Sequence, residues 1–437
     1  MKATTPRSGT RRVATVVTAL AATVALGAGC VGGGGQAPEE TSTKGAVSKD
    51  TKGTVRLLME GVPDSDIVKE LVPEFTKEYP GIKVEIQTLT YDQIRDKLVA
   101  SFQAPKPTYD LVVVDNPWMY DFAKAGFLEP LEGRVDNTDG YAYDDFAEPL
   151  RSINEVDGHT YGVPFYNYAL GLVYRKDLFA AEGIEPPKTL TELQAAAAKL
   201  TTAKRAGIAM QPQRGYKVFE EWGNFLFAEG GRIHDNSGNV TLDTPEGRKA
   251  LSAYIAMYEK SAPKNSLNWA FDEAQRAVSS DKAAMMVSYN WMLPALNKKG
   301  SGKFAGEFGL APFPGGHQVL GSWSWSIPAN SATSDASWAF VSWLTSKQGE
   351  KQRVLAGGAP VRTSVLSDAE VREQGGAEYY DTVRELLENS SPLSEGANGE
   401  EMIQAVGTEL NSAVAGKKSP AAALKAADDE AKKIRDE

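Results

Sequence analysis

Aromatic rings recur beside carboxylates and amides along this chain of 437 residues, which holds eight Trp, sixteen Tyr and fifteen Phe. Some of these rings must be core, but the supply is generous enough to furnish a surface site as well. A neutral, ring-shaped ligand needs flat aromatic side chains against its apolar faces, and planar carboxylates or amides for its hydroxyl groups. The residue types therefore favour binding of a hydroxylated small molecule.

Signatures of catalytic and metal chemistry are mostly missing from the sequence. It has no H-E-x-x-H, G-x-S-x-G or Walker A pattern, and it holds three His and one Cys. We therefore expect no metal site and no cofactor. Ser279 and Lys282 match an S-x-x-K pattern, which the end of a helix explains better than a nucleophile does. Acids are plentiful, but nothing singles out the two carboxylates that a glycosidase needs.

The elements that must position such side chains begin with alternating strand and helix patterns. Residues 55–59 and 82–86 alternate as strands do, and residues 67–75 and 94–102 carry apolar side chains at helical spacing. Residues 111–114 form a continuous apolar run, which suits a parallel strand covered on both faces. The order β-α-β-α-β predicts a doubly wound α/β sheet, and the length of the chain predicts two domains or lobes.

Several helix boundaries are marked in the sequence. Pro73 should bend or shorten the first helix. Thr189–Glu192 reads as a capping box, Thr244 with Pro245 as a helix start, and Gly230 with Gly231 as a helix end. After about residue 330 we expect helices to dominate.

The N-terminus has the features of an export signal, which we assign to residues 1–29. Basic residues up to Arg12 precede an apolar run, Val13–Leu26, that is shorter than the about 20 residues a membrane span requires. The single cysteine, Cys30, follows small residues at the expected cleavage site, as in a bacterial lipobox. We therefore expect lipidation at Cys30 and a flexible linker over 30–53, where almost nothing is apolar.

The charge of the chain limits its partners. Its formal net charge is -10, which argues against a nucleic-acid partner. No other segment is long and apolar enough to cross a membrane. We expect a monomer outside the cytoplasm, attached to the bacterial cell membrane only through its N-terminal lipid.

From Thr54 to about residue 366 the order of motifs resembles the family-1 extracellular solute-binding proteins, the group that includes maltose-binding protein. Each motif is weak alone, but six occur in the family's order. They are Phe75–Val84, Tyr109–Asp115 with Ala125–Leu131, Gly162–Phe165 with Leu172–Phe179, Asp281–Met286 with Trp291, Gly321–Pro328, and Gly357–Arg362.

The resemblance implies a periplasmic-binding-protein fold of two α/β lobes, joined by hinge strands with the ligand in the cleft between them. It places lobe 1 at 54–163 plus 284–327 and lobe 2 at 164–283 plus 328–437, the last part with a helical C-terminus. It also implies an ABC importer in which the protein delivers a neutral sugar or polyol to permease subunits driven by a cytoplasmic ATPase. The chain would then not be an enzyme.

Candidate ligand residues follow the strands, because ligands of open α/β sheets bind beyond the carboxyl ends of strands. Those after the first and third strands are Glu60, Asp115, Asn116 and Trp118. The first hinge crossing of the family suggests Tyr166 and Asn167. In its second lobe Arg214 follows the expected strand 207–210, and Trp222 and Asn224 begin the next helix. The later crossings suggest Asn290, Trp291, Trp323 and Ser324, and the glycine-proline turn suggests Arg362.

The same residues also admit other structural and functional interpretations. A helix cap would explain Asp115, a core position would explain Trp222, and a surface ion pair would explain Arg362. A secreted carbohydrate-active enzyme is the main rival function, followed by a lipoprotein that only scaffolds or adheres. Within the binding-protein class, the ligand could instead be a phosphorylated polyol, a peptide, a polyamine or a metal.

Overall fold

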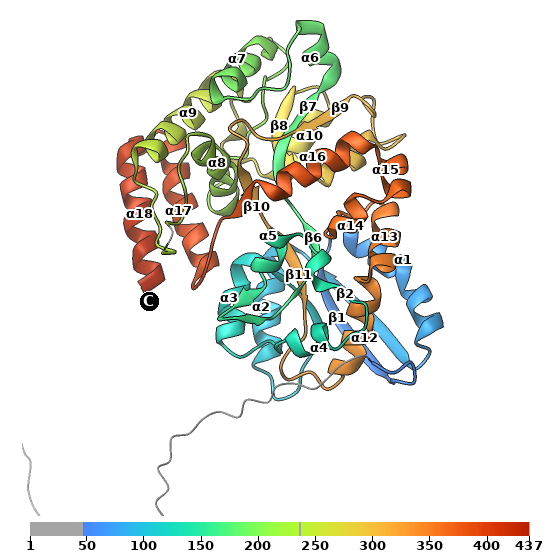
Figure 1. Ribbon diagram of the computed structural model, residues 1–437. Coiled ribbons are helices and arrows are strands. Elements are labelled where there is room, and N and C mark those ends of the chain that lie inside the picture. The colour runs from blue at the N-terminus through green and yellow to red at the C-terminus, as the bar shows by residue number, and fades with distance from the viewer. Residues whose placement is uncertain (1–46, 236, 437) are drawn as a thin grey trace, which may run out of the picture. The chain divides into compact units, whose positions relative to one another are not determined.

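A computed structural model describes residues 47–235 and 237–436, so the expected signal peptide, Cys30 and most of the linker lie outside the described residues. The expected β-α-β-α-β order is confirmed (Figure 1). The Leu111–Val114 run lies in a strand that is buried along its whole length. The elements are β1 (Gly53–Glu60), α1 (Pro63–Glu78), β2 (Ile82–Leu89), α2 (Tyr91–Phe102) and β3 (Leu111–Asp115).

Pro73 does not shorten α1, which runs through it to Glu78. The reason lies in its exposure. Pro73 and Lys69, the residue whose carbonyl loses its helical partner, both face solvent, so water can satisfy the free carbonyl. The capping box at Thr189 and the N-cap at Thr244 form as expected.

The first sheet has the strand order β2-β1-β3-β11-β6, where β6 is Val163–Asn167 and β11 is Ser322–Ser326. β1, β2 and β3 are parallel, whereas β11 runs antiparallel to both β3 and β6. The start of β11 therefore lies at the same edge as the ends of β1, β3 and β6. Smaller elements of this region are α3 (Asn116–Lys124), α4 (Glu132–Asp136), α5 (Glu148–Ser152), β4 (Glu155–Val156) and β5 (His159–Thr160).

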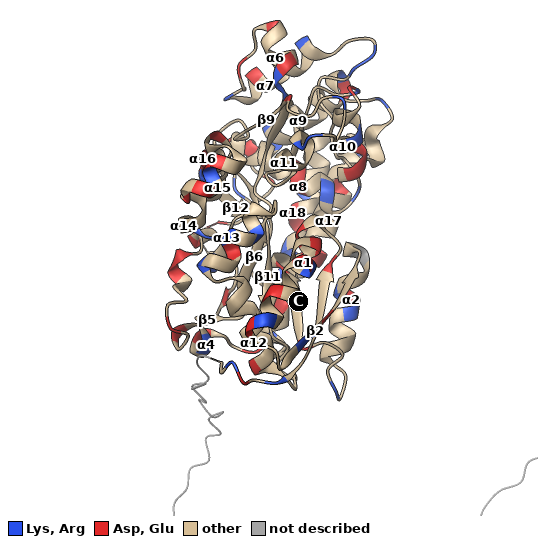
Figure 2. Ribbon diagram, turned by 90° about the vertical axis from the view of Figure 1, so that its right-hand side faces the viewer, with Lys and Arg blue, Asp and Glu red and all other residues tan. Residues whose placement is uncertain are grey.

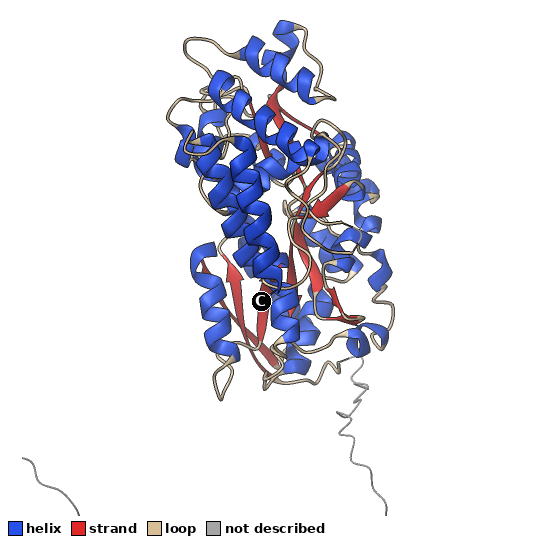
Figure 3. Ribbon diagram, turned by 90° about the vertical axis from the view of Figure 1, so that its left-hand side faces the viewer, coloured by secondary structure: helices blue, strands red, loops and turns tan. Residues whose placement is uncertain are grey.

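The second sheet has the order β8-β7-β9, and both neighbours of β7 run antiparallel to it. Helices lie around these strands (Figure 3). The strands are β7 (Leu170–Arg175), β8 (Met285–Tyr289) and β9 (Phe308–Ala311). The helices between them are α6 (Lys176–Glu182), α7 (Leu190–Leu200), α8 (Tyr216–Ala228), α9 (Pro245–Ser261), α10 (Phe271–Ser279) and α11 (Met292–Asn297).

These pairings differ from the lobe boundaries that the sequence suggested. β6 belongs to the first sheet, so the chain crosses after Asn167 and not after residue 163. β8 and β9 pair with β7, so residues 285–311 belong to the second sheet. The reason is strand pairing. β8 and β9 lie on either side of β7 in an antiparallel sheet, and the chain returns to the first sheet only through β10 (Gln318–Leu320) into β11.

The expected division is also wrong for the segment after residue 328. α12 (Ser334–Leu344) covers the first sheet, because Ser337 donates to the backbone oxygen of Asp110 at 2.8 Å and Phe340 packs edge-on against Phe75 at 5.0 Å. A helix placed directly after β11 buries its apolar face on the nearest sheet. The next helix, α13 (Lys347–Leu355), packs against α1.

The chain then returns to the second sheet, and helices dominate its C-terminal part as expected. Phe225 of α8 packs against Tyr254 of α9 at 5.1 Å, and the last two helices pack against this pair. The remaining elements are α14 (Thr363–Leu366), α15 (Ala369–Gly375), α16 (Ala377–Glu388), β12 (Ser390–Pro392), α17 (Gly399–Val414) and α18 (Pro420–Asp436). Below, lobe 1 means the first sheet with α1–α5, α12 and α13, and lobe 2 means the second sheet with α6–α11 and α16–α18.

Two further findings bear on partners. Among the described helices, none combines the length and apolar character needed to cross a bilayer. Basic and acidic residues are interspersed along the helices in the view of Figure 2. Interspersed charge of both signs agrees with the negative net charge in giving no support to a nucleic-acid partner.

Candidate functional site between the lobes

One edge of the lobe 1 sheet gathers polar and aromatic side chains from four strands. Glu60 ends β1 and Asp115 ends β3. Trp323 of β11 is paired in register with Asp115 on one side and with Tyr166 of β6 on the other. Because β11 is antiparallel to its neighbours, its start meets the ends of the others, and the four side chains come to one edge.

Aromatic rings pack around this edge. Trp323 meets Trp118 edge-on at 5.3 Å and Tyr91 at 6.1 Å, and it stacks with Tyr166 at 6.4 Å with 21° between the planes. Trp118 and Tyr91 come from the starts of α3 and α2, so both follow strands directly. Trp118 and Trp323 are almost fully buried where the two lobes meet, so their apolar faces would become available to a ligand only when the lobes part.

Carboxylates lie against the rings. Asp115 accepts hydrogen bonds from the hydroxyl groups of Tyr168 at 2.7 Å and Tyr91 at 3.2 Å, and Glu60 accepts one from Tyr166 at 2.9 Å. Burial raises the pKa of Asp115 well above its usual range, and the nearby Glu60 and Glu400 raise it further, against the hydrogen bond from Tyr168. Burial also raises the pKa of Glu60.

Lobe 2 contributes a carboxylate to the same place. Glu400, in the first turn of α17, accepts hydrogen bonds from Trp118 Nε1 at 3.0 Å and from the Tyr91 hydroxyl at 3.2 Å. The Tyr91 hydroxyl thus lies within reach of both Asp115 and Glu400, one from each lobe. Two carboxylates meet at one hydroxyl group, which has a single proton to donate.

The start of α8 adds a second group from lobe 2. The hydroxyl groups of Tyr216 and Tyr168 lie 3.2 Å apart. Lys217 forms an ion pair with Glu220 at 2.9 Å and contacts the Tyr289 hydroxyl. Burial acts to lower the pKa of Lys217, but Glu220 and Tyr289 outweigh it, so this pKa is raised and the ammonium stays charged.

Amides join the lobes at the first crossing. Asn167 is fully buried, donates to the backbone oxygen of Pro360 at 2.7 Å and accepts from Asn290 Nδ2 at 2.7 Å. Asn290 Oδ1 in turn accepts from the backbone of Trp291 at 2.9 Å. These bonds use the side-chain groups of Asn167 and Asn290 to hold β6, the β8 end and the 360 turn together.

The described residues hold no group of three or more His, Cys, Asp or Glu suited to a metal ion. The arrangement at the cleft consists instead of aromatic faces, hydroxyl groups and carboxylates from two lobes. Such a set can hold a small hydroxylated molecule by stacking and hydrogen bonding.

A family comparison decides what kind of protein carries this site. The family described as bacterial extracellular solute-binding protein matches residues 62–351, which is well over half of the chain. The chain belongs to this family. It is an extracellular solute-binding protein with the two-lobe fold that the sequence predicts.

Two relatives of this solute-binding protein and one similar solved structure carry informative names. A probable amino-acid ABC transporter periplasmic-binding protein from Sinorhizobium fredii is 26% identical, over 69% of this chain and 70% of its own. The mannitol-binding protein of Pseudomonas aeruginosa is 28% identical, over 68% and 70%. An ABC transporter solute-binding protein from Agrobacterium radiobacter K84, solved with ribitol, is 28% identical with a TM-score of 0.78, over 88% and 99%.

The structure brings five of the sequence-predicted residues of this solute-binding protein together around the cleft. They are Glu60, Asp115, Trp118, Tyr166 and Trp323. Two further predicted residues lie next to this group. The side-chain oxygen of Asn116 accepts from the Tyr168 hydroxyl at 2.8 Å, and on the lobe 2 side Trp291 stacks on Tyr289 at 5.4 Å with 18° between the planes.

Other predicted residues lie elsewhere. Trp222 is fully buried against Phe219 within α8, as the core reading held. Asn224 is also fully buried, and its side-chain oxygen accepts from the backbone of Val319 at 3.0 Å. The two side chains lie on opposite faces of α8, and both are buried because neighbouring elements cover this helix on all sides from Val218 to Phe227.

Arg362, Ser324 and Arg214 also lie apart from the cleft cluster. Arg362 is buried over the Phe146 ring at 3.9 Å, and its guanidinium donates to Thr345 and to the 141–145 segment. It ties the end of α12, at Thr345, to that segment, and its ion pair with Asp145 at 3.3 Å is a buried version of the expected one. Ser324 is buried within β11, and Arg214 is exposed without a side-chain partner among the described residues.

Sequence reasoning missed Tyr91, Tyr216, Lys217 and Glu400. Tyr91 follows the end of β2 by two residues, so the strand-end rule that found Glu60 would have found it too. The other three stand at helix starts in lobe 2, after Gly215 and after Gly399. A glycine before a polar helix start is a weak signal, because it marks many helices that bind nothing.

Proposed function

We propose that this solute-binding protein captures a neutral sugar or polyol between its lobes and delivers it to the permease of an ABC importer. The observation that carries the proposal is the meeting of Trp118 and Trp323 with carboxylates from both lobes, Asp115 and Glu400. The rings suit the apolar faces of a sugar, and the carboxylates accept hydrogen bonds from its hydroxyl groups. The mannitol-binding relative and the ribitol complex support this class of ligand.

We infer the order of ligand binding from the lobe whose binding groups are already held in place. The lobe 1 edge presents Glu60, Asp115 and Trp323 on a rigid sheet, so we infer that the ligand settles there first. Closure then brings Tyr216 and Glu400 of lobe 2 over it, and the ligand replaces part of the cross-cleft bonding. The closed form is the one that the permease subunits, driven by a cytoplasmic ATPase, would bind.

The cleft chemistry also supports binding without catalysis. The carboxyl oxygens of Asp115 lie within hydrogen-bonding distance of three donors, the backbone N–H of Asn116 and the hydroxyl groups of Tyr168 and Tyr91. A buried carboxyl group whose pKa is raised is a poor nucleophile for a glycosidic carbon, and it can still accept a hydrogen bond from a ligand hydroxyl group. We therefore propose that the ligand leaves unchanged.

Thermal unfolding against a panel of sugars, polyols and amino acids tests the proposal on the purified chain. A ligand at a hundredfold its Kd adds about 2.7 kcal/mol to the folded state and raises the midpoint by several degrees. We expect a shift with a neutral sugar or polyol and full recovery of that compound afterwards. A shift with amino acids alone that Trp323→Leu abolishes would overturn the ligand class, and consumption of a sugar would make the protein an enzyme.

We also propose that Cys30 carries a lipid that holds the protein at the outer face of the cell membrane. Its position after Gly27–Gly29 at the end of an apolar run supports this. Cys30→Ser should move the protein from the membrane fraction to the medium or periplasm, without changing ligand affinity. Equal membrane retention of the variant would overturn the anchor.

A further inference from the structure

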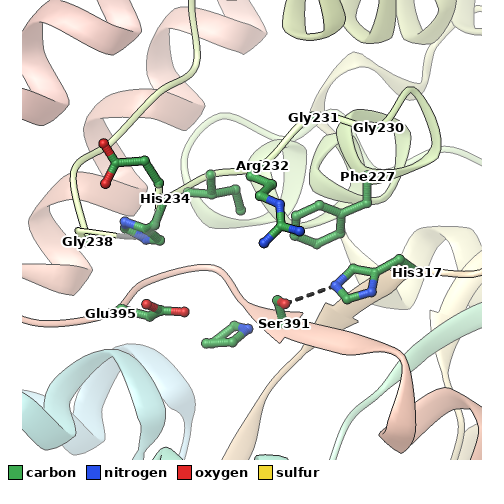
Figure 4. Close-up of a pocket in the computed structure, with 12 residues that line it drawn as sticks. Phe227, Gly230, Gly231, Arg232, His234, Gly238, His317, Ser391 and Glu395 are labelled. Atoms are coloured by element: carbon green, nitrogen blue, oxygen red, sulfur yellow. Dashed lines mark hydrogen bonds between the residues drawn. The ribbon is translucent and has the colours of Figure 1, made fainter.

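A hollow of about 510 Å³ lies between the end of α8 and the β10-β12 pair, and none of the residues that line it belongs to the cleft. Figure 4 shows its two sides. One side is formed by Phe227, near the end of α8, and by Arg232 and His234 in the segment after this helix. The other side is formed by His317, just before β10, and by Ser391 of β12. The volume suits a small organic molecule and is far larger than a single ion needs.

Two opposite charges face this hollow without an ion pair. Arg232 extends from the α8 side toward Ser391, whereas Glu395 stands on the β12 side below His234 (Figure 4). No side-chain hydrogen bond or ion pair joins either charge to another residue in the described part of the chain. An unpaired cation and an unpaired carboxylate on opposite walls complement a ligand that carries both charges.

Polar and aromatic groups between the two charges complete the lining. His234 is nine-tenths buried, and its Nδ1 has no hydrogen-bond partner among the described residues. His317 Nε2 lies 2.9 Å from Ser391 Oγ, and its ring meets the Phe227 ring edge-on at 5.0 Å. A buried ring nitrogen without a partner is costly, and a ligand group can satisfy it.

The charge balance argues against a bare anion. Burial lowers the pKa of both His234 and His317, so both imidazoles are neutral at pH 7. Arg232 is then the one cation among the lining residues, and Asp235 and Glu395 oppose it. Among these lining residues a lone phosphate or carboxylate would meet one cation and two carboxylates, and Arg435 of α18, which does not line the hollow, acts on Glu395 and His234.

We propose that this hollow binds a small zwitterion of the amino-acid type, with its carboxylate at Arg232 and its ammonium group at Glu395. The His317–Ser391 pair and His234 supply further hydrogen bonds, and Phe227 gives an apolar wall for a side chain. The site is separate from the cleft, so it does not depend on the cleft ligand. It is nevertheless connected to the cleft through the chain, because Glu395 precedes Glu400 by five residues.

Calorimetric titration of the purified full chain tests the proposal. The probes are glycine, serine, glutamine and phenylalanine, with acetate as a carboxylate alone and ethylamine as an ammonium group alone. We expect at least one amino acid to bind, and acetate and ethylamine to bind at least tenfold more weakly. Arg232→Gln and Glu395→Gln, two exposed positions, should each weaken amino-acid binding at least tenfold.

Matched controls separate this hollow from general charge effects and from the cleft. Lys347→Gln and Glu373→Gln remove one exposed charge of each sign elsewhere and should leave amino-acid binding unchanged. Trp323→Leu, which alters the cleft, should also leave it unchanged. Absence of binding by every amino acid, equal binding of acetate, or loss of binding only in Trp323→Leu would each overturn the proposal, the last by assigning the amino acid to the cleft.

Discussion

The two sides of the cleft are built in different ways. On the lobe 1 side, Glu60, Asp115 and Trp323 stand at the edge of one sheet, where the strand register fixes them relative to one another. On the lobe 2 side, Tyr216 and Glu400 stand at the starts of two helices that are about 180 residues apart in the chain. The comparison suggests a fixed binding surface on lobe 1 and a closing surface on lobe 2.

Removal of a ring from the fixed surface should have the largest effect on binding. Trp323→Leu deletes the ring that meets Trp118, Tyr91 and Tyr166, so we expect the affinity for the cleft ligand to fall about 100- to 1,000-fold, or about 3–4 kcal/mol. Calorimetric titration measures the loss. Trp343→Leu is the matched control, since Trp343 packs on Phe75 of lobe 1 away from the cleft. Equal losses of affinity in both variants would show that the lobe 1 surface is not the part that holds the ligand.

The lobes also differ in their buried carboxylates. Asp64 of lobe 1 pairs with Arg353, and its pKa rises only to about 6, chiefly through burial. Glu221 of lobe 2 has a Tyr254 hydroxyl and a backbone amide as partners, and burial raises its pKa to about 8. A raised carboxyl pKa means that the folded state keeps a proton that the unfolded state releases, so stability falls as pH rises from about 4.5 to 8.

The expected consequence is a pH-dependent loss that Glu221→Gln removes. Between pH 5.5 and 7.5 the free energy of unfolding should fall by about 2–3 kcal/mol more in the parent protein than in the variant. Urea unfolding at both pH values measures the difference. The same slope in both proteins would show that Glu221 does not hold its proton in the folded state.

Weakening the closing surface should have a moderate effect. Glu400→Gln leaves Trp118 Nε1 and the Tyr91 hydroxyl with a neutral acceptor, so we expect cleft affinity to fall about tenfold. Glu401→Gln is the neighbouring control, because its ion pair with Arg95 is half exposed and worth about 0–1 kcal/mol. An equal effect of both changes would assign the role to the general charge of this helix start.

A bulkier residue at the same helix start should have the smallest effect. A Cβ on Gly399 would lie 2.6 Å from Ser394 Oγ, a side chain that can rotate, and 2.7 Å from the backbone oxygen of Pro117 in lobe 1, so Gly399→Ala should hinder closure and weaken binding a few-fold. Gly302→Ala, with open space around it, is the control. Small-angle scattering with and without ligand measures closure. Unchanged closure in Gly399→Ala would show that lobe 2 approaches by another route.

Strand-end positions were predictable from the sequence, and helix-start positions were not. Val55, Leu57 and Met59 mark β1 by alternation, so Glu60 follows directly as a candidate, and Asp115 follows the apolar run of β3 in the same way. Glu400 follows a stretch with no comparable pattern, and it reaches the cleft only because α17 packs on α8 and α3. Long-range packing of this kind leaves no local signal.

The incorrect sequence-based predictions also arise from packing between distant segments. Trp222 and Asn224 were expected at the cleft because of their family position, but neighbouring elements bury both side chains. The expected lobe boundaries failed where β8 and β9 pair with β7, because strand pairing between distant segments decides which lobe a strand joins. Periodicity identifies an element, whereas its partners depend on the rest of the chain.

A crystal structure of the complex tests the central claim most directly, using the sugar or polyol that raises the unfolding midpoint most. We predict a ligand between the lobes, with a ring or carbon chain against Trp118 or Trp323 and hydroxyl groups donating to Glu60, Asp115 or Glu400. A ligand bound outside this cleft, or in contact with lobe 2 alone, would contradict the account of a fixed lobe 1 surface and a closing lobe 2.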